Sequence, residues 1–196
     1  YLGYDIWQLP PNGQGLVVLQ MMNILEQFDI AGPGPNSAAG FHLFLEAKKL
    51  CFADRAVYYA DMDFAKVPVE ELISKEYARQ RAKGIDLRKA AQSVQPGRIK
   101  NSSETVYLTV ADKEGNMVSL IQSLYSPWGS HYVVDGLGFA LQNRGSLFSL
   151  KEKAWNRLEP HKRPLHTIIP AFVTKDNKSV FSFGVTGGDF QPQGQV

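Results

Sequence analysis

Thr105 has the clearest route to chemistry in this chain, although no specialised residue stands next to it. It lies where the polar tract Asn101–Glu104 meets the alternating pattern of a β-strand. A threonine hydroxyl is a poor nucleophile without an adjacent base, and cleavage of the Glu104–Thr105 bond would create one, the free α-amine. With a pKa of about 7.7–8, that amine can accept the hydroxyl proton near neutral pH. The pattern alone favours the simpler interpretation, in which Thr105 only begins a strand.

The other titratable and nucleophilic residues do not form a recognisable site. The four histidines are not spaced as metal ligands, and a single cysteine excludes both an internal disulfide and a cysteine-based zinc site. The sequence contains no HExxH, CxxC, GxxxxGK or GxSxG motif. Cys51 lies in an apolar helical pattern and is expected to be an unreactive core thiol. The sequence therefore predicts neither a metal nor a cofactor.

Composition and charge are those of an ordinary globular chain. Of its 196 residues, 44% are hydrophobic and 20% are charged, which is enough to bury a core. A net charge of +2 gives no strong field for nucleic acid or an anionic membrane. No segment approaches the roughly 20 consecutive apolar residues of a transmembrane helix. Because neither end carries a signal-peptide pattern or a closing turn, we expect a piece of a longer protein, and the cellular compartment stays open.

The first half of the chain has the periodicity of helices. Pro10 and Pro11 stop a short strand at Leu2–Leu9, and Asn12 is positioned to cap the apolar, buried helix that follows. Ser37 is predicted to cap a long helix that extends to about residue 59. The residues of this helix expected to face the core are Phe41, Phe44, Leu45 and Phe52. Shorter helices are predicted at Val69–Ser74, Lys75–Lys83 and Leu87–Gln92.

The second half changes to the period of β-strands. Apolar and polar residues alternate over residues 105–110, and the turn DKEGN offers Gly115 for a positive φ before a return strand at Met117–Leu124. A second hairpin is predicted in the tract TIIPAFVTKDNKSVFSFGVTGG, which ends in Gly187 and Gly188. Helices followed by antiparallel hairpins predict an α+β fold with a buried sheet.

Several tracts, in order along essentially the whole chain, resemble the gamma-glutamyltransferase (gamma-glutamyltranspeptidase) family. ETVYLTVADKEGNMVSLIQSL resembles the start of the small subunit in this family of N-terminal-nucleophile hydrolases, which cleave themselves before a threonine. Further family motifs are resembled by PPNGQGLVVLQMMNILEQFD, FADRAVYYADMDFAKVPVEEL, KRPLHTIIPAFV and GVTGG. The resemblance implies a layered αββα domain. Residues 1–104 would be the mostly helical end of the large subunit, and residues 105–196 most of the small subunit, mostly β-hairpins.

The resemblance also implies roles for single residues. Thr105 matches the nucleophile that cleavage after Glu104 releases, and Ser123 matches a residue, usually threonine, whose hydroxyl assists it. Gly187 and Gly188 match a glycine pair whose backbone N–H groups form an oxyanion hole. Glycine suits that role because it lets the backbone approach a developing negative charge closely.

The chain departs from the family where glutamyl-specific members hold the α-amino and α-carboxylate groups of the substrate. The matching positions are Tyr125, Arg144, Leu147, His166 and Thr167. Leu147 replaces the acidic residue that would meet an ammonium, and the run LQNRGSLFSL resembles an acylase-like branch of the family. Unless Arg144 pairs with a surface acid, it suits a carboxylate, so glutaryl amides are expected to be cleaved better than gamma-glutamyl amides.

The resemblance thus implies an autoprocessed amidohydrolase or acyltransferase that transfers a gamma-glutamyl-like or glutaryl-like group through an acyl-enzyme. Its partners would be a small-molecule amide or peptide substrate and the rest of its own two subunits, without nucleic acid or a membrane segment. Two alternatives stay open. One is a true gamma-glutamyltranspeptidase that acts on glutathione-type substrates. The other is an uncleaved, non-catalytic scaffold, because residues 104 and 105 stand in one chain.

Overall fold

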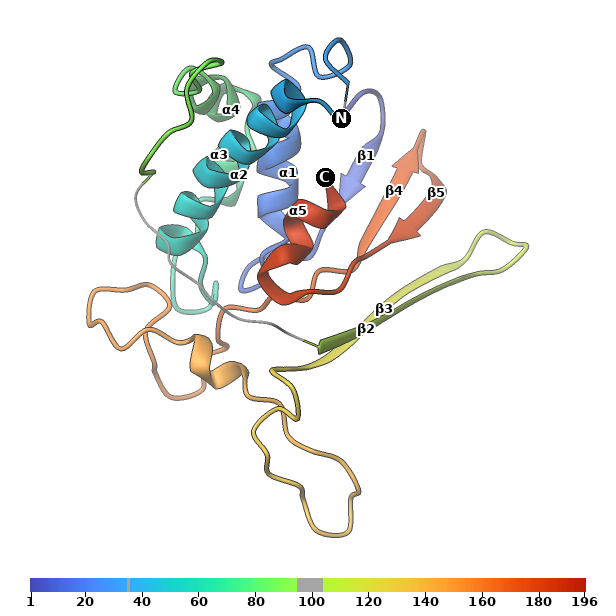
Figure 1. The fold of residues 1–196 in the computed structure, drawn as a ribbon. Coiled ribbons are helices and arrows are strands. Elements are labelled where there is room, and N and C mark those ends of the chain that lie inside the picture. Colours follow the sequence, from blue (N-terminus) through green and yellow to red (C-terminus); the bar gives the residue numbers. More distant parts are fainter. Residues whose placement is uncertain (35, 95–103) are drawn as a thin grey trace.

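The computed structural model describes residues 1–34, 36–94 and 104–196. Helices flank two antiparallel sheets, and α1 to α4 gather on one side of the molecule (Figure 1), so the expected α+β class is confirmed. One sheet joins β1 (Asp5–Trp7), β4 (Ala171–Lys175) and β5 (Lys178–Phe183), in that order. The other joins β2 (Glu104–Ala111) and β3 (Met117–Tyr125).

The helical layer contains the main hydrophobic core. Its helices are α1 (Gly15–Leu25), α2 (Ala38–Tyr58), α3 (Val69–Leu72) and α4 (Lys75–Ala82). Most of α1 is buried, as its nearly uniform apolar sequence predicts. The Ser37 side chain accepts a hydrogen bond from the Gly40 N–H (3.0 Å), so the predicted cap of α2 is confirmed. Cys51 is fully buried, and burial raises the pKa of its thiol well above the usual value.

The helix predicted at Leu87–Gln92 is wrong, because this segment forms bends and irregular structure. Side chains of α2 bind its backbone in place of helical partners. The Glu46 carboxylate accepts a hydrogen bond from the Ala91 N–H (3.3 Å), and Lys49 donates one to the Ala91 carbonyl (2.9 Å). Contacts with α2 therefore outweigh the local helical preference of the segment.

Two local predictions for the first half are also wrong. Phe41 and Leu45 are 54% and 47% exposed, whereas the other two residues of α2 predicted to face inward are partly buried against the core. The buried stripe of α2 instead includes Leu43, Ala47, Leu50 and Cys51. Asn12 does not cap α1, since its side-chain amide donates to the Pro164 carbonyl (2.6 Å) and the N-cap position is Gln14.

Both predicted hairpins form. Gly115 has a φ of +86° in the turn between β2 and β3, as predicted, and Asp176 and Asn177 make the turn between β4 and β5 with φ of +50° and +59°. Strand β1 pairs with β4, so the start of the chain joins the sheet of the last third. The polar tract Asn101–Glu104 is expected to be an exposed loop; its residues 101–103 lie outside the described residues, and Glu104 is instead the first residue of β2.

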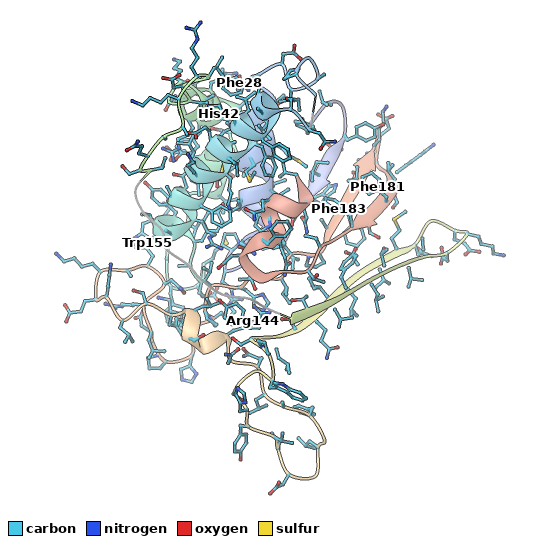
Figure 2. All side chains as sticks on the ribbon, viewed as in Figure 1. Phe28, His42, Arg144, Trp155, Phe181 and Phe183 are labelled. Carbon is cyan, nitrogen blue, oxygen red and sulfur yellow. The ribbon has the colours of Figure 1, made fainter. Side chains whose placement is uncertain are left out.

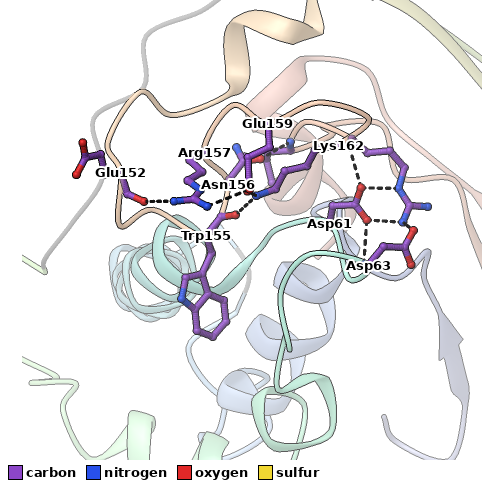
Figure 3. Close-up of polar contacts among 10 residues, drawn as sticks. Asp61, Asp63, Glu152, Trp155, Asn156, Arg157, Glu159 and Lys162 are labelled. Atoms are coloured by element: carbon purple, nitrogen blue, oxygen red, sulfur yellow. Dashed lines mark hydrogen bonds and ion pairs between the residues drawn. The ribbon is translucent and has the colours of Figure 1, made fainter.

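The long connection between β3 and β4 is attached to the helical layer. Trp155 packs edge-on against Tyr58 of α2, with ring centroids 5.5 Å apart (Figure 2). Nearby, Asp61 accepts hydrogen bonds from the backbone N–H (2.8 Å) and Nε (2.9 Å) of Arg163 (Figure 3). Asp63 accepts a further bond from Nη2 of the same arginine (2.7 Å). The hydrogen bonds that Asp61 accepts from Arg163 lower the pKa of the Asp61 carboxyl well below its usual range.

We expect Asp61→Asn to lower the free energy of unfolding by about 2–3 kcal/mol, because Asp61 is only 1% exposed and its charge compensates Arg163. Urea unfolding at pH 7 measures this loss. Asp63→Asn is the matched control, since it removes an exposed carboxylate from the same arginine and should cost about 0–1 kcal/mol. Equal losses in the two variants would contradict a special contribution from the buried carboxylate.

Candidate active site

Thr105 and Ser123 lie opposite each other on β2 and β3. The Thr105 hydroxyl donates a hydrogen bond to Ser123 Oγ (3.2 Å), which also accepts one from the Tyr125 N–H (2.9 Å). The pairing shifts register between Glu104 and Thr105, because the partner changes from Tyr125 to Ser123 and skips Leu124. Such a bulge turns side chains locally. The bond predicted to be cleaved is thus at an irregular point of the ladder.

The face of β2 that carries Thr105 is turned toward the end of β5. The hydroxyls of Thr109 and Ser182 hydrogen-bond to each other, and the Tyr107 ring occupies the space beside Gly184, where an added Cβ would lie 2.4 Å from it. Side chains at positions 105, 107 and 109 share a face of the strand. Tyr107 and Thr109 thus contact the segment that leads from β5 to the paired-glycine turn, on the face of β2 that also carries Thr105.

That turn depends on two glycines in the left-handed region. Gly187 has a φ of +119° and Gly188 a φ of +55°, conformations that strain other residues. The Gly187 carbonyl accepts a hydrogen bond from the Phe190 N–H (2.9 Å), and the Gly188 carbonyl accepts one from Gln14 Nε2 (2.9 Å). Within the described residues, neither glycine N–H donates a hydrogen bond. Both can therefore serve a developing oxyanion.

The residues predicted to bind substrate come together around Arg144, next to the last residue of β3, Tyr125. Arg144 is 3% exposed, its Nη1 donates to Thr167 Oγ1 (2.6 Å), and its Cζ lies 5.2 Å from the centre of the Tyr125 ring (Figure 2). Arg144 forms no ion pair with any described carboxylate, and its Nη2 is buried without a hydrogen-bond partner. A pairing of Arg144 with a surface acid is therefore not observed. Leu147 instead packs against the hydrophobic core.

His166 is next to this cation and is neutral at neutral pH, mainly because it is buried. Burial, and then the positive charge of Arg144, lower the pKa of His166 to about 4. Its Nδ1 accepts a hydrogen bond from the Ile168 N–H (3.3 Å). At neutral pH the wall formed by Tyr125, Arg144, His166 and Thr167 thus carries one positive charge, and His166 is too weak a base to replace the Thr105 amine.

We expect the protein to lose stability as the pH falls from about 6.5, the ordinary pKa of histidine, toward 4. In that window the unfolded chain binds a proton that His166 does not bind in the folded chain, so protonation favours unfolding. His166→Asn should flatten this part of the curve by about 2 kcal/mol, after allowance for partial exposure. Urea unfolding at successive pH values measures it, with the exposed His131→Asn as control. The prediction fails if the pH slope persists in His166→Asn.

A buried network that sequence patterns did not predict supports both parts of the site. Gln14 donates hydrogen bonds to the carbonyls of Thr167 and Gly188. Arg55 in turn donates to the side chains of Gln14 and Asp189. Gln14 and Gly188 are 174 positions apart in the sequence, and Arg55 and Asp189 are 134 positions apart. Gln14 and Arg55 do fall inside motif tracts, but no local periodicity reports contacts over such separations.

The part of the chain that the structure describes contains no group of three or more His, Cys, Asp or Glu side chains arranged to hold a metal ion. In the same residues, no helix is both long and apolar enough to cross a membrane.

Comparisons with known proteins found relatives that match nearly the whole chain. The sequence profile described as Gamma-glutamyltranspeptidase matches residues 1–196. The glutathione hydrolase-like YwrD proenzyme of Bacillus subtilis (strain 168) is 44% identical over 197 residues, which cover 100% of this chain and 37% of the relative. The oxamate amidohydrolase proenzyme of Klebsiella pneumoniae is 36% identical over 191 residues, covering 97% of this chain and 35% of the relative.

A solved structure supports the same relationship. The crystal structure of cephalosporin acylase from Bacillus halodurans matches with a TM-score of 0.89 and 46% sequence identity. The match covers 100% of this chain and 35% of the acylase chain. The present chain thus spans only about a third of the length of the proteins it resembles.

Proposed function

The chain belongs to the gamma-glutamyltranspeptidase family, and from this membership we propose that its parent protein is an autoprocessed amidohydrolase or acyltransferase with Thr105 as nucleophile. The observation that carries the proposal is the position of the Thr105 hydroxyl, which is hydrogen-bonded to Ser123 on a strand whose same face contacts the segment that leads from β5 to the paired-glycine turn. Two relatives are named as proenzymes, which supports activation by cleavage.

The proposed reaction begins when cleavage after Glu104 frees the α-amine of Thr105. That amine takes the proton of the Thr105 hydroxyl as Oγ1 attacks the substrate carbonyl carbon. Ser123 holds the hydroxyl, and the N–H groups of Gly187 and Gly188 stabilise the oxyanion. The carbon–nitrogen bond then breaks, and the leaving amine takes the proton from the α-ammonium. Water or an acceptor amine attacks the ester and restores Thr105.

The two subunits proposed here would form one domain. Residues 1–104 would end the large subunit and residues 105–196 would begin the small one, and the pairing of β1 with β4 supports a shared sheet across that division. One face of the β2–β3 hairpin is apolar and exposed. Its residues are Val106, Leu108, Val110, Val118 and Leu120. Further segments of the same protein, whose relatives are far longer, are the proposed cover of this face.

The proposed acyl group ends in a carboxylate. Arg144 supplies a buried positive charge with an unused N–H donor at Nη2, and no described carboxylate neutralises it. Because Nη2 is enclosed, a carboxylate reaches it only when a neighbouring side chain of the wall, such as Tyr125, moves aside. A gamma-glutamyl group would also bring an ammonium into contact with this cation. A glutaryl-like group is therefore preferred over a glutathione-type donor.

The mass of the purified full-length protein tests the proposed processing. We expect two polypeptides that separate under denaturing conditions and whose masses place the division between Glu104 and Thr105. Intact mass spectrometry resolves that position to a single residue. One undivided chain without amidase activity would instead favour the non-catalytic scaffold.

A further inference from the structure

Gln14 connects the paired-glycine turn to the substrate-binding wall. Its side chain is completely buried just before α1. Nε2 donates hydrogen bonds to the carbonyls of Thr167 (2.7 Å) and Gly188 (2.9 Å), and Oε1 accepts one from Arg55 Nη1 (2.5 Å). The same Arg55 nitrogen donates to Asp189 (2.6 Å). One amide thus contacts both parts of the proposed active site.

The partners of Gln14 leave only one orientation for its amide. A guanidinium can only donate hydrogen bonds, and backbone carbonyls can only accept them. The amide oxygen must therefore face Arg55, and both N–H bonds of Nε2 must be directed to the two carbonyls. With both donors used in a fully buried site, the side chain has no freedom to rotate without leaving polar groups unsatisfied.

The bond from Gln14 to the Gly188 carbonyl restrains the backbone next to the proposed oxyanion donor, the Gly188 N–H. In a planar trans peptide the carbonyl and the N–H point in opposite directions. Phe190 binds the Gly187 carbonyl, which shares its peptide plane with the Gly188 N–H. Gln14 binds the Gly188 carbonyl in the following plane, and the backbone N–H of Gln191 also donates to that oxygen. The hydrogen bonds from Phe190, Gln14 and Gln191 together fix the backbone on both sides of Gly188, which tolerates many conformations by itself.

We propose that Gln14 is a positioning residue: by binding the Gly188 carbonyl it restrains the backbone at Gly188 so that the Gly188 N–H faces the oxyanion, and by binding the Thr167 carbonyl it holds the substrate-binding wall at a fixed place relative to that N–H. The inference rests on the proposed function, in which that N–H stabilises the charge formed on the substrate carbonyl. Charge on this oxygen develops in the transition state, so a misplaced donor lowers kcat and leaves KM nearly unchanged. If the Gln14 amide had only a structural role, its loss would lower stability without selectively lowering kcat relative to KM.

The test compares Gln14→Met with Gln20→Met in the full-length, processed protein. Gln20 is the matched control because it is also a buried glutamine next to the core, 2% exposed, and bonded to Asp54 and Tyr59 away from the site. Methionine keeps the side-chain length and removes the amide in each case. We expect kcat on the anilide that the wild type cleaves best to fall on the order of 10- to 100-fold in Gln14→Met, with KM within about threefold. Gln20→Met should keep a kcat near that of the wild type.

Gln14→Glu provides a second variant if the apolar one does not fold. It keeps an oxygen for Arg55, but it replaces the two N–H donors by a second oxygen and a negative charge that face the carbonyls of Thr167 and Gly188, so it should lose kcat at least to a similar extent. Wild-type kcat in a folded Gln14 variant, or equal losses in the Gln14 and Gln20 variants, overturns the inference while the proposed function stands. If the wild-type protein is neither processed nor active, the proposed function is wrong, and this inference, which rests on it, is wrong as well.

Discussion

Thr105→Ala is expected to leave the full-length precursor uncut and to abolish amide hydrolysis, a loss on the order of 10⁴-fold or more. The alanine lacks the hydroxyl that must attack the preceding carbonyl during processing and the substrate carbonyl during turnover. The hydrogen bond to Ser123 is lost with it, but the strand pairing of Thr105 uses backbone atoms, so the fold should persist. A denaturing gel and intact mass spectrometry report processing, and release of aniline from an anilide substrate reports turnover.

Two further variants separate loss of the nucleophile from a general disturbance of β2. Thr105→Ser keeps a hydroxyl and should still be cleaved, although more slowly. Thr109→Ala removes a threonine hydroxyl from the same face of the strand, where it binds Ser182, and should be processed as the wild type is. Normal cleavage of Thr105→Ala would exclude Thr105 as the nucleophile.

Glutaryl anilide should be cleaved at least about 10-fold better than gamma-glutamyl anilide by the processed full-length protein. One charge contact of about 1.4 kcal/mol suffices for a tenfold difference. Arg144 offers a cation with an unsatisfied donor, and an ammonium next to it would lose hydration without gaining a counter-charge. The ratio of kcat/KM for the two anilides measures the preference directly.

Arg144→Ala should remove most of this preference, because the contact that distinguishes the two acyl groups is lost. The same change opens the space beside Tyr125 and Thr167, so stability has to be measured in parallel. Arg157→Ala is the matched control, since it removes a half-exposed arginine that pairs with Glu159 and should leave the ratio unchanged. Equal kcat/KM values for both anilides in the wild type would rule out a carboxylate-selective wall.

The amino-acid sequence by itself determined the elements whose causes are local. The apolar pattern of α1, the cap at Ser37 and the positive φ of Gly115 each depend on residues within a few positions of one another. The α+β class followed from these elements, and the ordered motifs pointed to the family. The sequence also singled out Thr105 and the paired glycines as candidates, whose roles remain predictions.

Only the tertiary structure decided which distant groups meet. Bonds from α2 to Ala91 replaced the helix expected at Leu87–Gln92, and burial beside Arg144 made His166 a weak base. The contacts of Gln14 with Thr167 and Gly188 join segments more than 150 positions apart, which no local pattern records. Hydrogen bonding and burial depend on which atoms the packed chain brings within about 3 Å, and that information exists only once the sheets and helices are assembled.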